Sequence, residues 1–466
     1  MVVDAAGPFQ RPDYRLARAA VAAGAHYLDI AEDASWLAGF SDALSPAAVR
    51  AGRAALAGCS TTPALVAAAV AAARLQTVLS VDSAILASGG PAGRSLIDSI
   101  LRQLGKPVPG FDAGRSRTEA GRSFGSVSFR HGRVISPVST ADPALLPAAF
   151  DVRNRVTLSA GLESGAMHLL LHCLSLLVPR NGSAAPLAPL LERAQHLFVP
   201  FQRNCGALHV CVAGVPHSPD VAFCQVHVRV SASQGQGFGL PVAPVIALLR
   251  SGSFGPPGAG VCGVDRALTL TELQEHVFRL PAFSTVEWQV RHTELARGIF
   301  ESFRDLPQTL LQFHRCVFGV FRGNVTVTAG RSRLARLAAR LVGFPAVDCE
   351  DSPFEFTLER RLEGELWTRN VCGISSFRSL VSRDDTGRFF EAFGPVRLQL
   401  RVESRGGRLL FSVLRLSFFG LPLPRIVSCE ASEFETEQKR YGFDVSLSLL
   451  GTALVRYRGS MEKVRD

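Results

Sequence analysis

Residues 1–10, MVVDAAGPFQ, start with an apolar run and end on a Gly-Pro turn. We expect residues 2–6 to be a buried strand, residues 14–23 a helix and residues 26–30 a second strand. A strand, a helix and a parallel strand form a βαβ unit, which needs a crossover connection of this length. The stretch therefore predicts an α/β fold for the first part of the chain.

A dinucleotide-binding sheet holds the cofactor phosphates on a Gly-x-Gly-x-x-Gly turn between its first strand and helix. No such turn precedes residues 2–6. Residues 258–263, GAGVCG, match it by letter, but Pro256 and Pro257 come directly before them and argue against a central strand. We interpret that segment as a flexible loop. The pattern predicts a partial Rossmann-like sheet, the second half of a dinucleotide-binding domain truncated at its start.

Three segments of the first domain resemble the saccharopine dehydrogenase-like oxidoreductases. They are DAAGPFQ, GAHYLDIAED and GCSTTPAL, at residues 4–10, 24–33 and 58–65. In that family the Gly-Pro-Phe turn ends a Rossmann strand near the nicotinamide, so the resemblance implies NAD(P) as the cofactor. It places five residues at the cofactor: Gly7, Pro8, Phe9, Tyr27 and Asp29.

From about residue 306 the chain resembles a different module, a C-terminal domain of unknown function often fused behind such oxidoreductases. The segments that carry this resemblance are GRSRLARLAARLVGFP, ELWTRNVCG, FGPVRLQLRVE, LPLPR and LVRYRG. Together with the spacing of apolar residues, the two resemblances predict three domains. These are a partial dinucleotide-binding domain at 1–86, a mixed α+β middle domain at 87–305, and a mainly antiparallel β domain at 306–466.

The last domain alternates short apolar runs with turns, which is typical of an antiparallel sheet, open or partly closed on itself. We expect one helix there, at residues 331–342, because leucines recur on one face and arginines on another. Pro422 and Pro424 favour a loop at residues 421–425 over a central strand.

Acidic residues follow the second strand, at Asp29, Glu32 and Asp33. They either orient a ribose, a substrate amine or a proton, or they cap the next helix, and capping is the commoner use. His168 and His172 lie four residues apart on an expected helix, but Leu169 stands where a metalloprotease has glutamate. We therefore predict no metal site, and the sequence identifies no catalytic residue.

Aromatic and arginine side chains recur in the last domain. They are Trp367, Arg369, Arg397, Arg401, Arg456 and Tyr457. Inside a closed sheet they could hold the acidic head group of an apolar ligand. On the outside they would be ordinary surface residues.

The formal net charge is +10, and only Lys106, Lys439 and Lys463 are lysines, so arginine carries nearly all the positive charge. No basic cluster is interleaved with stacking aromatics, and we expect no nucleic-acid partner. The ten cysteines have no metal-type spacing, and we expect them to be reduced in a cytoplasmic protein. No apolar run reaches about 20 residues, so we expect no transmembrane segment. An open edge at residues 2–6 favours a homo-oligomer.

Two functions remain open. The first is an NAD(P)-dependent oxidoreductase acting on a small molecule, which we expect to bind its cofactor weakly or not at all in this chain. The second is a non-catalytic binding or scaffold protein with a ligand-binding β domain.

Overall fold

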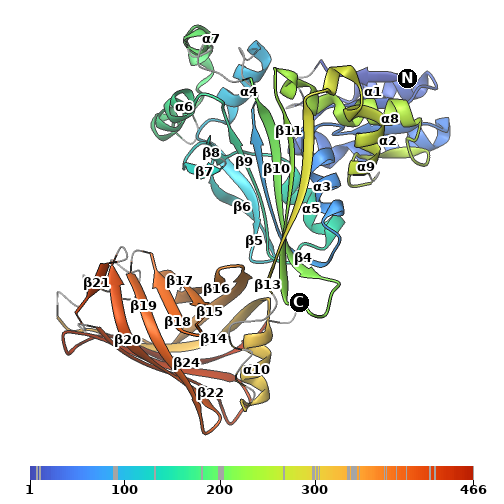
Figure 1. The fold of residues 1–466 in the computed structure, drawn as a ribbon. Helices are drawn as coiled ribbons and strands as arrows, with labels where there is room; N and C mark the ends of the chain where they lie inside the picture. Colours follow the sequence, from blue (N-terminus) through green and yellow to red (C-terminus); the bar gives the residue numbers. More distant parts are fainter. Residues whose placement is uncertain are drawn as a thin grey trace. The chain divides into compact units, whose positions relative to one another are not determined.

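The computed structural model is described over most of the chain and divides into two units (Figure 1). The described residues are 1–464 without 7–8, 10–11, 88–92, 131–132, 180–181, 198–203, 266–267, 296–299, 301–302, 304, 333–335, 337–338, 340–343, 346, 372, 374, 385, 395, 419–420 and 425–426. Unit 1 comprises Met1–His217 and Gln225–Thr293, and unit 2 comprises Ser218–Cys224 and Glu294–Asp466. The fold is of mixed class, as expected, with a parallel sheet, a mixed sheet and an antiparallel sheet.

A four-stranded parallel sheet forms the start of unit 1, in the order β1-β2-β3-β12. Its strands are β1 (Val2–Asp4), β2 (Tyr27–Asp29), β3 (Ala54–Ala57) and β12 (Gly258–Val261). Helix α1 (Arg15–Ala22) connects β1 to β2, and helix α2 (Ala34–Ala51) connects β2 to β3. The predicted βαβ unit is confirmed. Among the described strands β1 has one neighbour, and Val3 is 42% exposed there.

The GAGVCG segment was interpreted wrongly as a loop, because Gly258–Val261 is the strand β12. Its preceding prolines lie just outside the strand, and among the described strands β12 has one partner, β3, so the prolines cost no ladder hydrogen bond. A Cβ at Gly260 would lie 2.6 Å from the Asp265 Cβ, so glycine is needed there for close packing. Gly258 and Gly260 lie in the strand itself, and only Gly263 lies in the turn that follows it. A phosphate loop needs its first glycines in a turn that opens a helix, so the match by letter is no phosphate loop.

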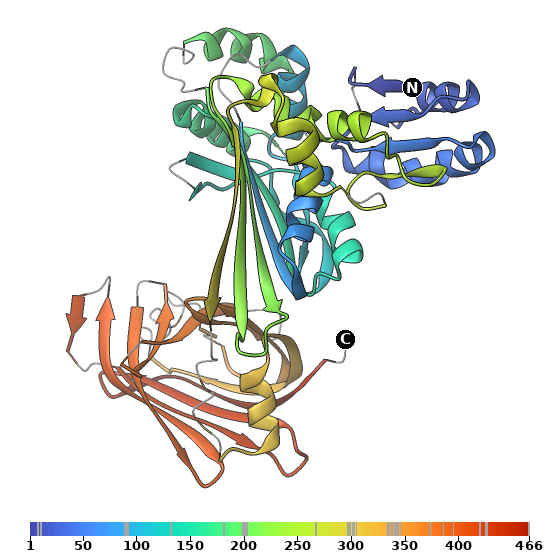
Figure 2. The ribbon, with the colours of Figure 1, turned by 45° about the vertical axis from the view of Figure 1, so that its right-hand side comes forward.

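The mixed sheet of unit 1 has the order β13-β11-β10-β4-β9-β5-β6, with β8 paired to β9 and β7 to β8. Its strands are β4 (Leu75–Leu86), β5 (Pro107–Asp112), β6 (Arg115–Arg122), β7 (Ser128–Arg130), β8 (Arg133–Pro137), β9 (Arg155–Gly161), β10 (Gly206–Pro216), β11 (Phe223–Ala232) and β13 (Val286–Leu295). β4 runs parallel to β9 and antiparallel to β10. Figure 2 shows β10 and β11 as long, paired strands.

Seven helices accompany these strands in the described part of unit 1. They are α3 (Val66–Ala72), α4 (Arg94–Gln103), α5 (Asp142–Phe150), α6 (Gly165–Leu177), α7 (Ala188–His196), α8 (Ala243–Ser251) and α9 (Leu270–Leu273). The expected helix near residues 162–178 is α6, and alternation in β11 buries Val226, Val228 and Val230 as predicted.

Unit 2 is an antiparallel sheet that closes on itself, as the orange and red ribbon of Figure 1 shows. Its elements are α10 (Gln308–Arg315), β14 (Phe318–Ala329), β15 (Cys349–Arg361), β16 (Gly364–Val371), β17 (Ser375–Arg383), β18 (Phe389–Phe393), β19 (Val396–Arg405), β20 (Arg408–Phe418), β21 (Leu421–Leu423), β22 (Val427–Glu435), β23 (Tyr441–Leu449) and β24 (Thr452–Lys463). β14 pairs with both β15 and β24, and β19 pairs with β20. These pairings close the ring of strands around one apolar core.

The segment at 421–425 was predicted to be a loop, but it contains β21, a three-residue strand at the end of the strand order, which its prolines permit because they exclude only a central strand. The expected helix at 331–342 lies largely outside the described residues and stays a prediction. Helix α10 was not predicted. It buries Leu310 and Phe313 against the core and is too short to show a clear helical period in the sequence.

We predict that residues 294–466 fold alone, and more stably than residues 306–466. Phe300 is 2% exposed and its ring stacks on Phe389 and Trp367, at 5.4 and 6.3 Å between centroids. Losing a buried phenylalanine costs about 3–5 kcal/mol, so the shorter segment should unfold at a markedly lower urea concentration. Circular dichroism should show a β-type spectrum with one cooperative transition. Equal midpoints for the two segments, or a mainly helical spectrum, would contradict the prediction.

Candidate functional site at the carboxyl ends of the parallel strands

Tyr27 and Asp29, two of the residues expected at the cofactor, are the first and last residues of strand β2, and both side chains are fully buried. The Tyr27 hydroxyl donates to Asp4 Oδ2 at 3.1 Å, which ties β2 to β1. Burial raises the pKa of the Tyr27 phenol, with the nearby Asp29 carboxylate adding to the effect. In this structure Tyr27 joins strands rather than facing a solvent-exposed site.

Asp29 links the ends of two parallel strands. Its Oδ1 accepts from the Gly58 and Ala31 amides at 2.9 and 3.0 Å, and its Oδ2 accepts from Trp36 Nε1 at 2.9 Å. Burial raises the Asp29 pKa to about 6, although these three donors favour the charged form. The carboxylate therefore fixes the turn after β3 beneath the start of α2.

The other expected cofactor residues lie before α1. Gly7 and Pro8 fall outside the described residues. The Phe9 ring packs edge-on against Trp36, with centroids 5.0 Å apart and planes at 72°. Assignment of these five residues to a cofactor remains a prediction.

The capping interpretation is confirmed for Asp33 alone. Asp33 Oδ1 accepts from the Ser35 and Trp36 amides at 2.9 and 3.4 Å, so it caps α2. Glu32 instead reaches the segment after β3, where its Oε1 accepts from Ser60 Oγ at 2.7 Å and from the Thr62 amide at 3.3 Å. Burial raises the Glu32 pKa, and these hydrogen bonds oppose the shift.

A second buried carboxyl group, Asp142 at the start of α5, completes the cluster. Within the described part of the chain neither of its carboxylate oxygens has a hydrogen-bond partner, and the side chain is fully buried. Burial, together with the smaller effect of the Glu32 charge, raises the Asp142 pKa to about 8. The hydroxyls of Thr62 and Thr140 are also buried without a described partner.

We call Glu32 and Asp142 the carboxyl pair. Their charges interact in a buried environment, so ionisation of one disfavours ionisation of the other. A buried carboxyl group whose pKa is raised to about 8, as that of Asp142 is, can hold and release a proton near neutral pH, which is what general acid-base chemistry requires. Sequence reasoning noticed Glu32 but missed Asp142, because no local pattern connects α5 with β2.

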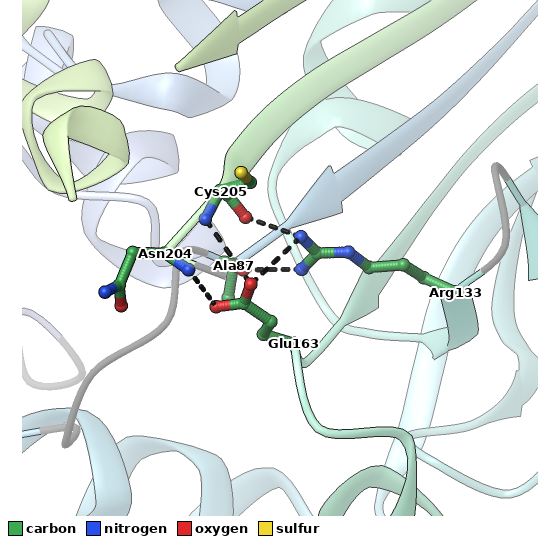
Figure 3. Close-up of polar contacts among 5 residues, drawn as sticks. All are labelled: Ala87, Arg133, Glu163, Asn204 and Cys205. Carbon is green, nitrogen blue, oxygen red and sulfur yellow. Dashed lines mark hydrogen bonds and ion pairs between the residues drawn. The ribbon is translucent and has the colours of Figure 1, made fainter. Parts of the chain in front are cut away.

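A second polar cluster lies where β4, β8, β9 and β10 meet (Figure 3). Arg133 donates to the carbonyls of Ala87 and Cys205 at 2.9 and 2.6 Å, and its Nη2 lies 3.7 Å from Glu163 Oε1. Glu163 in turn accepts from the Asn204 and Cys205 amides at 3.2 and 3.4 Å. Since both side chains bind backbone groups that follow or precede these strands, the ion pair fastens the strand ends to one another.

The two histidines of α6 do not form a metal site. His168 Nε2 lies 2.8 Å from Ser136 Oγ, and its Nδ1 accepts from the Leu162 amide at 3.3 Å. His172 Nδ1 lies 2.6 Å from the Phe124 carbonyl. Burial lowers the His168 pKa to about 4, so this ring is neutral and structural. Across the described residues, no group of three potential ligands is placed to hold a metal ion.

The arginines and aromatics singled out in unit 2 separate into two sets. Trp367, Arg369 and Tyr457 are buried and line an interior cavity of about 60 Å³. Arg397, Arg401 and Arg456 are exposed, and Arg456 pairs with Asp444 at 2.7 Å. Strand alternation decides which set faces inward.

Comparison with known proteins supports the predicted C-terminal module. Residues 306–461 match the family described as "Domain of unknown function (DUF4166)". No curated protein matches the chain. None of the helices within the described residues has the length and apolar content required to cross a membrane. The matched segment begins just before α10 and ends near the end of β24. It therefore corresponds to this domain of unknown function.

Proposed function

We propose that unit 1 is part of an NAD(P)-dependent oxidoreductase of the saccharopine dehydrogenase-like class, acting on a small molecule. The observation that carries the proposal is the carboxyl pair beside the carboxyl ends of β2 and β3 in a parallel sheet. Ligands of open α/β sheets bind outside the carboxyl ends of the strands. Buried titratable groups with shifted pKa values gather at such sites.

The residues present fit the nicotinamide half of the cofactor better than its pyrophosphate. A pyrophosphate needs free amides at a helix start. In α2 those amides are already bound by the Asp33 carboxylate, and the Thr62 amide after β3 is bound by Glu32. The negative charges of Asp33 and Glu32 would also repel the phosphates of the cofactor. Phe9, packed on Trp36, supplies the apolar surface that a ring needs.

Each group then has a distinct role. Bound nicotinamide supplies a hydride donor or acceptor. Phe9 would hold one face of the ring, and Asp29 holds the strand ends in register through its three hydrogen bonds. The carboxyl pair accepts or returns the proton that accompanies oxidation or reduction of a hydroxyl or amine.

We expect the chain to bind reduced nicotinamide mononucleotide and NADH with similar, weak affinity, within about threefold of each other. The adenosine and pyrophosphate would add little because the start of α2 holds the Asp33 carboxylate and the Thr62 amide after β3 is bound by Glu32. Isothermal titration with both compounds measures the two constants. Phe9→Ala should weaken binding of the mononucleotide about tenfold, while Leu16→Ala, which truncates an exposed apolar residue of α1, should not change it.

Two outcomes would contradict the proposal. NADH binding more than about tenfold tighter than the mononucleotide would reveal a pyrophosphate site. No saturable binding of either compound would remove the nicotinamide site altogether.

A further inference from the structure

Helix α6 of unit 1 presents leucines to solvent and turns polar side chains inward, which reverses the usual arrangement of a surface helix. His168 and Ser175 lie on its buried side, where they are hydrogen-bonded to the Ser136 hydroxyl and the Phe124 carbonyl, each at 2.8 Å. Its exposed side carries a stripe of five residues, which we call the α6 stripe: Leu169, Leu170, Cys173, Leu176 and Leu177.

The α6 stripe is a large apolar surface without charge. Its four leucines are 44, 41, 57 and 77% exposed in chain order. The whole helix contains no Asp, Glu, Lys or Arg. Leu190 of α7, a helix that shares a small core with α6, is 64% exposed as well. Figure 1 shows the two helices at the periphery of unit 1. Monomeric proteins seldom leave such a face open, so it marks an interaction surface.

The composition of α6 favours a protein partner over a lipid surface. A helix that lies in a membrane interface carries Lys and Arg on the polar face beside its apolar one. The polar face of α6 is turned into the protein, and it holds histidine and serine instead of cations. The stripe therefore suits a second surface that is equally apolar and uncharged.

The α6 stripe is also symmetric about its centre. Leu169 and Leu170 lie four and three residues before Cys173, and Leu176 and Leu177 lie three and four residues after it. With about 3.6 residues per turn, Cys173 falls on the midline, Leu169 and Leu176 on one flank, and Leu170 and Leu177 on the other. A two-fold axis through the midline at Cys173 would match the stripe to itself, as the same patch does on both subunits of a symmetric dimer.

We propose that two copies of this chain form a dimer by packing their α6 helices antiparallel around a two-fold axis at Cys173. Leu169 then meets Leu176 of the second copy, and Leu170 meets Leu177 of the second copy. Every exposed leucine of the stripe is covered in this arrangement. The small Cys173 side chain on the midline lets the two helices approach closely. This interface is separate from the open edge of β1, whose strand has only three residues.

Sedimentation equilibrium of the full chain tests the interface. The parent should dimerise with a Kd below about 10 µM. Leu169→Glu should weaken the dimer at least thirtyfold, because it places a charge against an apolar side chain at both symmetric positions. Leu16→Glu makes the same change at a residue of α1 that is 48% exposed, and it should leave the Kd unchanged. Circular dichroism should show the parent spectrum for both variants, since both leucines are on the surface.

Oxidation by diamide tests the position of the axis without any substitution in the parent. Two Cys173 thiols would form one disulfide, and the two protons and two electrons that they lose would reduce the diazene of diamide to a hydrazine. We expect a covalent dimer on a non-reducing gel from the parent and none from Cys173→Ser. A non-covalent dimer that diamide does not join through Cys173 would refute the antiparallel pairing.

Three further outcomes would overturn the proposal. A parent chain that stays monomeric up to about 100 µM has no such interface. A dimer that Leu169→Glu does not weaken uses another surface. A monomer that sediments with vesicles of phosphatidylcholine and phosphatidylserine, and that Leu169→Glu releases from them, would assign the α6 stripe to a lipid surface instead.

Discussion

Arg133→Met should lower the free energy of unfolding of unit 1 by about 3–5 kcal/mol, because it removes one partner of a buried ion pair. Arg133 and Glu163 are only 17% and 6% exposed. The substitution removes the charged donor to the Ala87 and Cys205 carbonyls and the ion pair with the Glu163 carboxylate. Four strand ends would lose the contact that joins them.

The matched control is Arg94→Met. Arg94 also pairs with a carboxylate, and its 2.9 Å distance to Glu192 is shorter, but the two side chains are 55% and 33% exposed. Exposed pairs contribute about 0–1 kcal/mol, so the control should unfold nearly as the parent does. The free energy of unfolding of both variants can be measured from the hydrogen exchange of backbone amides in β9 and β10 at increasing urea concentrations. Equal losses in the two proteins would show that burial does not decide the strength of these ion pairs.

Asp142→Asn should stabilise the protein at pH 8.5 and change little near pH 4. The folded-state pKa of Asp142, about 8, lies above the usual 3.8. The folded chain therefore keeps a proton that the unfolded chain releases, and the free energy of unfolding falls as the pH rises from about 4 to about 8. Asparagine cannot ionise, so this loss disappears. We expect a gain of several kcal/mol at pH 8.5, because each unit of the pKa shift corresponds to about 1.4 kcal/mol.

Thermal unfolding between pH 4.5 and 8.5 would measure this effect. Asp42→Asn makes the same change on an exposed residue of α2 and should follow the parent curve at every pH. If Asp142→Asn also runs parallel to the parent curve, the Asp142 carboxyl is already ionised in the folded chain and the carboxyl pair does not hold a proton.

Local patterns predicted much of the fold. Three features were predicted correctly because each depends on residues close together in the sequence. They are the apolar run at Val2, the alternation from Val226 to Val230 and the spacing of strands in unit 2. β12 was missed because its pairing with β3, more than two hundred residues earlier, overrides the weak strand tendency of glycine.

The candidate site was less accessible to sequence reasoning. Asp29 and Glu32 stood out because they follow a strand, but which partners they bind depends on the turn at Gly58 and Ser60. Asp142 carried no signal, since a single aspartate before a proline is an ordinary helix start. Its importance comes from the absence of described partners around it, a property of the tertiary structure alone.

The closure of unit 2 has a consequence for how the protein is made. β14 pairs along its length with β24, so Phe321 lies opposite Lys463 across a very long loop of sequence. Contacts so distant along the chain form late, because the loop entropy must be overcome first. During synthesis β14 to β23 can form hairpins one after another, yet the ring stays open until β24 has left the ribosome. The aromatic interior would meanwhile be accessible to water and to chaperones, and it would become a closed core only after β24 has been synthesised.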